Sequence, residues 1–155
     1  MSADTIEGEV SARGRHVAIV AARFNDLIVA SLLKGARTTW SERGGDPEHL
    51  LVVRVPGAFE LPVAARKLAG SGRYDAVVAL GCVIRGDTPH FDYVAGECAR
   101  GLQLAGLETG VPVAFGVLTV ESLEQALERA ATSAGNKGGE AMESALEMAA
   151  VMARL

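Results

Sequence analysis

The sequence of 155 residues lacks the features that mark several large classes of protein. It has no run of basic residues and a formal net charge of −4, which argues against binding to nucleic acid or to a membrane surface. No uncharged apolar stretch approaches the roughly 20 residues that a transmembrane helix needs. Residues 1–14 lack the basic and then apolar layout of a signal peptide. We therefore expect a cytoplasmic protein with neither nucleic-acid nor membrane partners.

Cysteines and cofactor motifs are also scarce. Cys82 and Cys98 are too few for a disulfide framework or a set of metal ligands, and we interpret both as small buried residues in a reducing cytosol. A nucleophilic pair of Cys82 with His90 is a weaker interpretation, because Cys82 lies inside an apolar run with no basic neighbour. The glycine motifs GxGxxG and GxxxxGKS/T are absent, so neither a dinucleotide-binding fold nor a nucleoside triphosphatase is indicated.

What the chain does contain is a regular alternation of apolar runs and helical patterns. Hydrophobic residues make up 49% of the sequence and charged residues 22%, and the length suits one domain with a sizeable core. Short apolar runs predict buried strands at 15–22, 49–55, 75–84 and 112–120. Helical patterns predict helices at 26–43, 58–68, 89–107, 122–131 and 140–154. The alternation predicts one α/β domain over 15–155, with a parallel sheet between two layers of helices.

Unusual residues follow three of the predicted strands. The sequence RFN at 23–25 follows the first strand, PGAFE at 56–60 the second and RGDTPH at 85–90 the third. The carboxyl ends of parallel strands share one edge of the sheet, and ligands of such sheets bind at that edge. The three loops therefore predict a ligand-binding site there.

The stretch 79–95 carries the strongest site signal. Thr88 is the expected N-cap of the third helix and Pro89 its expected first residue, which puts His90 in the first helical turn. Free backbone N–H groups and the helix dipole favour an anion at that place. A histidine near a helix start is often only a polar surface residue. Here a glycine, a hydroxyl and an imidazole occur together within 86–90, which favours a catalytic His90.

Three other side chains have both a structural and a functional interpretation. The ring of Phe24 either stacks on a flat heterocycle or packs against the helix that follows it. The carboxylate of Glu60 either interacts favourably with the dipole at the start of a helix or binds a polyol chain by hydrogen bonds. Arg129 is an ordinary solvated residue unless the fold brings it near Thr88, where it would bind phosphate.

The last predicted helix has an unusually wide apolar face. Its polar side is little more than three glutamates, a serine and an arginine. An exposed face of this width would be a sizeable patch, so we expect it to be buried between subunits. The apolar residues are Ala141, Met142, Ala145, Leu146, Ala149, Ala150, Met152 and Ala153.

Four motifs in order give the chain a family resemblance. VPGAFELP at 55–62, LGCVIRGDTPHFDYV at 80–94, FGVLT at 115–119 and GNKG at 135–138 resemble the lumazine synthase family, and the likeness extends from about 17 to 150. The resemblance implies the condensation of 5-amino-6-(D-ribitylamino)uracil with 3,4-dihydroxy-2-butanone 4-phosphate to 6,7-dimethyl-8-ribityllumazine. Phosphate and water are released in this step of riboflavin biosynthesis, and the family uses no metal and no organic cofactor.

The resemblance also implies a fold and an assembly. The fold is a flavodoxin-like, three-layer sandwich with a four-stranded parallel sheet. Subunits form pentamers, in many members assembled into icosahedral shells of sixty subunits, with active sites between neighbours. A riboflavin synthase is then a candidate partner. One use open to the N-terminal arm, residues 1–14, is to add a strand to the sheet edge of a neighbouring subunit.

For the aminopyrimidine, the resemblance implies three sets of contacts. Phe24 would stack on the pyrimidine ring. The ribityl chain would be held by Ala58, Phe59 and Glu60. The pyrimidine pocket would be lined, through backbone groups, by Cys82, Val83 and Ile84.

For the second substrate, the resemblance implies an anion site and a proton carrier. Asp87 and Thr88, with Arg129, would bind the phosphate, and His90 would be the general acid and base. Two further residues would reach the site from the adjacent subunit: Phe115 and Lys137.

Two rival interpretations remain at this point. An archaeal-type riboflavin synthase, related to this family, would dismutate two lumazine molecules. A non-catalytic relative would only bind flavin or lumazine, or form a cage. The PGAFE and GDTPH motifs favour the lumazine synthase over the first rival, and His90, Arg129 and Lys137 favour it over the second.

Overall fold

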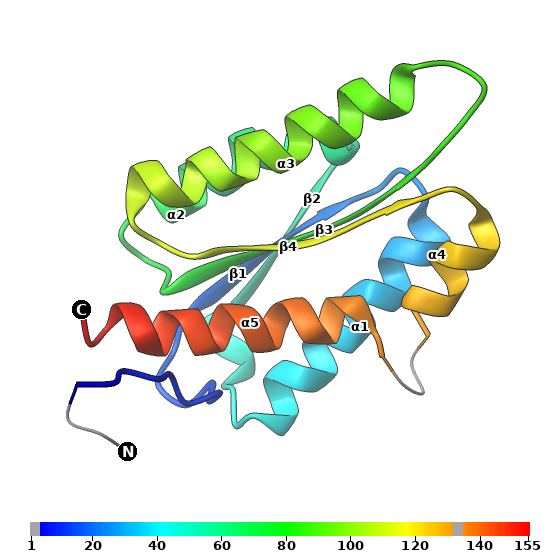
Figure 1. The fold of residues 1–155 in the computed structure, drawn as a ribbon. Helices are drawn as coiled ribbons and strands as arrows, with labels where there is room; N and C mark the ends of the chain where they lie inside the picture. Colours follow the sequence, from blue (N-terminus) through cyan, green and yellow to red (C-terminus); the bar gives the residue numbers. More distant parts are fainter. Residues whose placement is uncertain (1–3, 132–134) are drawn as a thin grey trace.

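Four parallel strands form the centre of the protein. They are β1 (Val17–Ala22), β2 (Leu50–Val55), β3 (Ala76–Ile84) and β4 (Val113–Val120), hydrogen-bonded in the order β2-β1-β3-β4 (Figure 1). The computed structural model describes residues 4–131 and 135–155. All four predicted strands are confirmed, and each begins one or two residues later than the sequence indicated.

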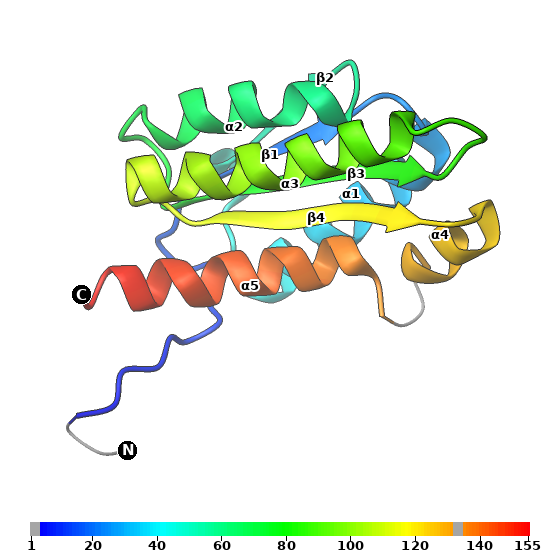
Figure 2. The same cartoon turned by 45° about the horizontal axis from the view of Figure 1, so that its top comes forward.

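Helices cover both faces of the sheet, which makes three layers (Figures 1 and 2). α2 (Leu61–Ala69) and α3 (His90–Thr109) lie on one face, while α1 (Asp26–Glu42) and α5 (Lys137–Met152) lie on the other. The short α4 (Leu123–Arg129) follows β4 at the carboxyl end of the sheet. The predicted α/β sandwich with a four-stranded parallel sheet is therefore confirmed.

The two faces of β1 show why this strand reads as one continuous apolar run. Val17 and Ile19 point into the core shared with α1 and α5, whereas Val20 and Ala22 point into the core shared with α2 and α3. All six residues of β1 are buried. A strand in the middle of a parallel sheet has helices on both sides, so neither of its faces can be polar.

The wide apolar face of α5 is covered within the subunit, so this expectation from the sequence is wrong in its main part. The helix packs against α1 and the sheet together, and two neighbours need more apolar surface than one. The close approach depends on Gly138, because a Cβ there would fall on the carbonyl group of Leu32 in α1. The residues buried inside the subunit are Ala141, Met142, Ala145, Leu146 and Ala149.

The first described residues lie against the same helix. A Cβ on Gly8 would meet the carbonyl oxygen of Glu147, and Arg154 donates to the carbonyl oxygen of Glu7 at 3.4 Å. Residues 4–14 contain no strand in the isolated subunit. Residues 1–3 of the arm lie outside the described part of the chain.

Candidate active site

A cavity of about 560 Å³ lies at the carboxyl ends of the strands, beside the β1–β3 pair. The chain leaves β1 for β2 on one side and returns to β3 on the other, and such a switch point is where parallel sheets bind ligands. Residues from all three loops that the sequence singled out meet there. We call this cavity the His90 pocket; it is lined by Phe24, Asn25, Pro56, Gly57, Ala58, Phe59, Glu60, Cys82, Val83, Ile84, His90, Tyr93 and Val94.

Backbone hydrogen bonds hold the loop of Phe24 beside the loop that follows β2. The N–H of Arg23 donates to the carbonyl of Val55 at 2.8 Å, and the N–H of Phe24 donates to that of Pro56 at 3.0 Å. These bonds continue the pairing of β1 and β2 beyond the sheet. The Phe24 side chain stays 71% exposed, which leaves its ring free to contact a ligand.

The second wall of the pocket is the PGAFE segment. The structure places Ala58–Glu60 in a single 3-10 turn, so the α-helix begins at Leu61 and not at Ala58 as predicted. A Cβ on Gly57 would come within 3.2 Å of Glu60 Oε1, so a larger residue there would displace this carboxylate slightly. Ala58 is buried, whereas Phe59 is 58% exposed.

The end of β3 forms the floor. The side chain of Cys82 packs in the core shared with α1 and α5, on the far side of the sheet from α3. Burial raises the pKa of the Cys82 thiol to about 11, so it is a neutral thiol near pH 7. The nucleophilic pair of Cys82 with His90 is therefore not supported. Cys82, Val83 and Ile84 line the pocket where the strand ends.

The loop between β3 and α3 brings His90 to the rim. α3 begins at His90, one residue later than predicted, and Pro89 rather than Thr88 is the N-cap residue. The hydroxyl of Thr88 accepts from the N–H of His90 at 3.4 Å. His90, Thr88 and Asp87 are exposed beside the start of a 20-residue helix, which is a place suited to an anion.

Arg85 connects this loop to α3 and to the end of β4. Its guanidinium lies 2.7 Å from Glu121 and 3.5 Å from Asp92, and 4.3 Å from the ring centroid of Phe91. The charge of Arg85 is therefore already shared by two carboxylates of the same chain.

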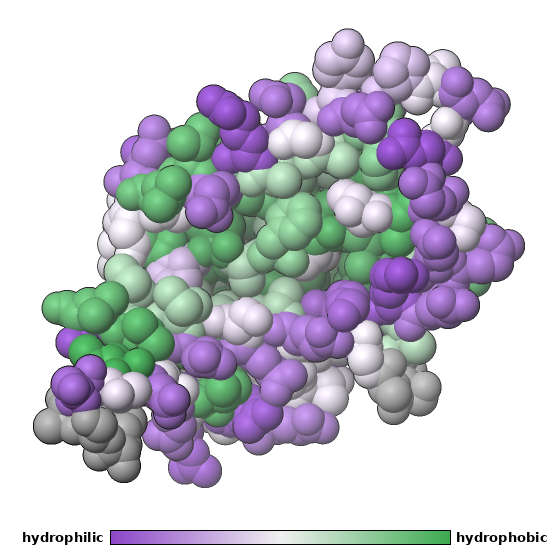
Figure 3. Space-filling model, in the orientation of Figure 1, coloured by the Kyte–Doolittle hydropathy of each residue, from purple (hydrophilic) through white to green (hydrophobic). Residues whose placement is uncertain are grey.

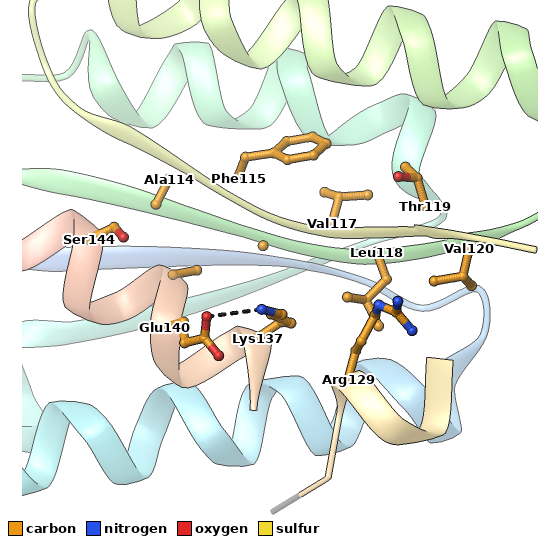
Figure 4. A pocket seen from close by; sticks show the side chains of 12 residues that line it. Ala114, Phe115, Val117, Leu118, Thr119, Val120, Arg129, Lys137, Glu140 and Ser144 are labelled. Carbon is orange, nitrogen blue, oxygen red and sulfur yellow. Dashed lines mark hydrogen bonds and ion pairs between the residues drawn. The ribbon is translucent and has the colours of Figure 1, made fainter. Parts of the chain in front are cut away.

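A second cavity, of about 390 Å³, lies across the free edge of β4 (Figure 4). Phe115 and Thr119 extend from one side of the strand, while Arg129 and Lys137 lie on the other side (Figure 4). Lys137 pairs with Glu140 at 3.1 Å. We call it the Arg129 cleft; it is lined by Ala114, Phe115, Gly116, Val117, Leu118, Thr119, Val120, Arg129, Lys137, Glu140, Ala141 and Ser144.

The helix that carries Arg129 is fixed at its start. The hydroxyl of Ser122 accepts from the N–H of Gln125 at 3.2 Å, as the predicted capping box requires. The side chain of Gln125 accepts from the N–H of Glu121 at 2.8 Å, one residue before the N-cap. The guanidinium of Arg129 donates to the carbonyl of Gln125 at 3.1 Å and is otherwise exposed to the cleft.

The candidate residues thus fall into two groups within one subunit. Ten of them line or flank the pocket of His90, and three line the cleft at the β4 edge. Arg129 lies with Phe115 and Lys137 and does not line the pocket beside Thr88.

The sequence interpretation assigned no individual role to several residues of the pocket. Tyr93 and Val94 of α3 line it, and so does Asn25. Tyr93 follows His90 by three positions and so shares its helix face, a signal that helical spacing gives. The left-handed backbone of Asn25, with φ of 61°, has no equivalent signal in the sequence.

A broad apolar area crosses the face of the molecule around β4 (Figure 3). Between the ends of α3 and α5 it continues into an apolar groove that includes Leu107, Met148 and Met152. Leu107 is 70% exposed and Phe115 is 48% exposed. A contiguous apolar patch on a surface marks an interaction site.

Within residues 4–131 and 135–155, no group of three or more His, Cys, Asp or Glu side chains is placed to hold a metal ion. No helix in the same part of the chain is long and apolar enough to cross a membrane.

Comparison with known proteins identifies the family. Residues 14–153 match the family model of 6,7-dimethyl-8-ribityllumazine synthase. Proteins of that name from Nitratidesulfovibrio vulgaris, strains DP4 and Miyazaki F, are each 55% identical to this chain over 151 residues, which is 97% of either chain. The chain belongs to the 6,7-dimethyl-8-ribityllumazine synthase family. The motifs of this lumazine synthase family that the sequence displays all fall in or beside the two cavities described above.

Proposed function

We propose that the protein is a transferase of riboflavin biosynthesis that carries out the reaction of its family. It condenses 5-amino-6-(D-ribitylamino)uracil with 3,4-dihydroxy-2-butanone 4-phosphate, forms 6,7-dimethyl-8-ribityllumazine and releases phosphate and water. Family membership over almost the whole chain supports this reaction. The observation that carries it is the His90 pocket, which combines an aromatic ring, a carboxylate and an imidazole at one switch point.

In this proposal the aminopyrimidine occupies the His90 pocket. The exposed ring of Phe24 stacks on the flat heterocycle, and Glu60 accepts hydrogen bonds from the ribityl hydroxyls beside Ala58 and Phe59. Backbone groups of 82–84 face the edge of the ring. Holding two reactants in one cavity removes much of the entropic cost of their meeting.

His90 handles the protons. The amine of the pyrimidine attacks the ketone carbonyl, and the imidazole moves protons from nitrogen to the oxygen that leaves as water. The phosphate lies at the start of α3 beside Asp87 and Thr88, where helix N–H groups stabilise its charge as it leaves.

A second subunit completes the site in this proposal. None of the described residues that line the His90 pocket is a lysine or arginine, whereas the Arg129 cleft offers both. The β4 edge of a neighbour would bring Arg129, Lys137 and Phe115 to the rim of the pocket. An interface that joins two different surfaces repeats from subunit to subunit and forms a ring when its rotation closes.

We propose that the ring is a pentamer, and that pentamers assemble into an icosahedral shell in the cytoplasm. The apolar area around β4 is the surface that such a ring would cover. The N-terminal arm, 1–14, adds a strand to the free edge of a neighbour's β2, which would pair an otherwise open row of backbone groups. A riboflavin synthase, which would consume the product, is the protein partner we propose.

The reaction is tested by mixing the purified protein with both substrates. The fluorescence of the lumazine and the release of phosphate are followed together, against a control without protein because some product forms unaided. The proposal predicts that both signals rise together well above this background. Signals at the background level, with tight binding of the lumazine, would indicate a non-catalytic binder. Riboflavin formed from the lumazine alone would indicate a riboflavin synthase.

A further inference from the structure

Asn25 has a backbone conformation that is unusual for the N-cap residue of a helix. Its φ of 61° and ψ of 45° lie in the left-handed region, and no other non-glycine residue in the described part of the chain has a positive φ. Residues with a Cβ avoid this region for steric reasons, although asparagine tolerates it better than most. Asn25 stands at the N-cap of α1, where an extended backbone and a side-chain hydrogen bond to the helix are usual. It has neither.

The carboxamide of Asn25 is used elsewhere. Its Nδ2 donates to the carbonyl oxygen of Cys82 at 2.8 Å, across 57 positions of the chain. The pairing of β1 with β3 ends at Ala21 and Leu80, two residues before Cys82. The side chain therefore supplies a hydrogen bond to β3 just beyond the point where the strand loses its β1 partner.

The bond lies directly under the proposed aminopyrimidine site. Two hydrogen bonds fix the position of Phe24. Its own N–H donates to the carbonyl of Pro56, and the carboxamide of the next residue, Asn25, donates to the carbonyl of Cys82. Both Asn25 and Cys82 line the His90 pocket. A left-handed residue at this place reverses the chain between β1 and α1, so that the loop can make both contacts at once. Strained backbone retained in a pocket is a reason to look for a role there.

We propose that Asn25 is a positioning residue for the aminopyrimidine, an inference that rests on the proposed function. Its left-handed turn and its carboxamide together hold the ring of Phe24 over the pocket and fix the peptide groups of 82–84 that face the substrate. Asn25 acts through these two partners, so its loss weakens recognition of the pyrimidine and leaves recognition of the phosphate substrate intact.

Two substitutions separate the backbone from the side chain. Asn25→Gly keeps the left-handed turn, which glycine adopts without strain, and removes the carboxamide. Asn25→Asp keeps the size and much of the tolerance for this turn, but directs an acceptor at the carbonyl of Cys82. Ser31→Ala is the control, because the hydroxyl of Ser31 donates to the carbonyl of Leu27 at 3.4 Å within α1, outside the pocket.

We expect KM for the aminopyrimidine to rise about tenfold in Asn25→Gly and further in Asn25→Asp, while KM for the butanone phosphate stays within about twofold. The Kd of the lumazine product, followed by its fluorescence, should rise by a similar factor. Ser31→Ala should match the wild type in all three quantities. Melting temperatures are measured alongside, and if Asn25→Asp is unfolded at the assay temperature, Asn25→Gly decides.

A wild-type KM and Kd in Asn25→Gly would overturn the role of the carboxamide. An equal rise of both KM values would show general loosening of the subunit and would overturn the inference too. Failure of the proposed function looks different, because the wild type itself would then lack turnover. In that case the Kd of the lumazine for wild type and variants still decides the role of Asn25, and no binding by the wild type would refute both proposals.

Discussion

The two cavities of the subunit differ in how they are built and in what they offer. The His90 pocket consists of loops tied to one another by backbone bonds, and it contains one carboxylate, Glu60, and one imidazole, His90. The Arg129 cleft lies on the open edge of β4, and helix ends bring two cations to it. One cavity can recognise a heterocycle and move protons, while the other can neutralise a phosphate. In the proposed function these two cavities are the two halves of one active site, contributed by neighbouring subunits, and neither half is sufficient alone.

Removing the guanidinium of Arg129 from the cleft should have the largest effect. We expect Arg129→Ala to lower kcat about 1000-fold and to raise KM for the butanone phosphate, because a positioned cation stabilises the charge of the leaving phosphate. KM for the aminopyrimidine should stay close to the wild-type value. Arg37→Ala, on the exposed face of α1, is the matched control and should leave the kinetics unchanged. Steady-state assays with each substrate varied in turn test this prediction. An equal rise of KM for both substrates would contradict the assignment of the pyrimidine to one cavity and the phosphate to the other.

Removing the imidazole of the pocket should cost less. His90→Ala is expected to lower kcat about 100-fold at saturating substrates, the usual contribution of a positioned acid and base. His49→Ala is the control, because His49 stacks on His16 with 4.0 Å between ring centroids, outside both cavities. Nearly full turnover in His90→Ala would show that protons move without this side chain.

The cleft also depends on how closely α5 approaches α1. Gly138→Ala should lower the free energy of unfolding by about 2 kcal/mol, because the new methyl group would fall on the carbonyl of Leu32. Gly96→Ala in α3 is the control, because a Cβ at this position has no atom within 4 Å in the subunit. This substitution should raise the stability of the helix by up to about 1 kcal/mol, because alanine favours the helix more than glycine does. Denaturant unfolding of both variants tests the pair, and equal stabilities would contradict the close packing described for α5.

The thiol below the pocket should matter least. Cys82→Ala is expected to keep kcat within about twofold, since the side chain faces the opposite core. Because the pKa of Cys82 is raised from 9.0 to about 11, roughly one thiol in a thousand is ionised at pH 8, and iodoacetamide should label the folded protein very slowly. The unfolded chain loses this proton near pH 9 and the folded chain near 11, so stability should fall between these values. Rapid labelling of Cys82 at pH 8 would contradict its burial.

Local sequence patterns were sufficient for much of the fold and for the position of the His90 pocket. Buried strands separated by helical patterns predicted the parallel sheet, and the loops at 23–25, 56–60 and 85–90 do meet at its carboxyl edge. These features depend on short-range periodicity and on a general rule of parallel sheets.

The remaining features depend on contacts between distant segments. The apolar face of α5 was assigned to a contact with a second subunit. The sequence does not show that α5 packs against both α1 and the sheet within its own subunit. Arg129 was expected beside Thr88, yet within one subunit it faces the β4 edge with Phe115. The left-handed turn of Asn25 accompanies a hydrogen bond from its side chain to the carbonyl of Cys82, 57 positions away. Only the folded chain brings these two residues close together.

The most direct test of the proposal that neighbouring subunits share one site is a mixture of two variants that are each strongly impaired. His90→Ala and Arg129→Ala subunits, carrying different tags, are produced together in equal amounts and the mixed oligomers are purified. If the halves come from different subunits, about one interface in four pairs an intact pocket with an intact cleft, and turnover should reach about a quarter of the wild-type value. If both halves act within one subunit, every site lacks one of the two side chains. Turnover no higher than that of the separate variants would contradict the account.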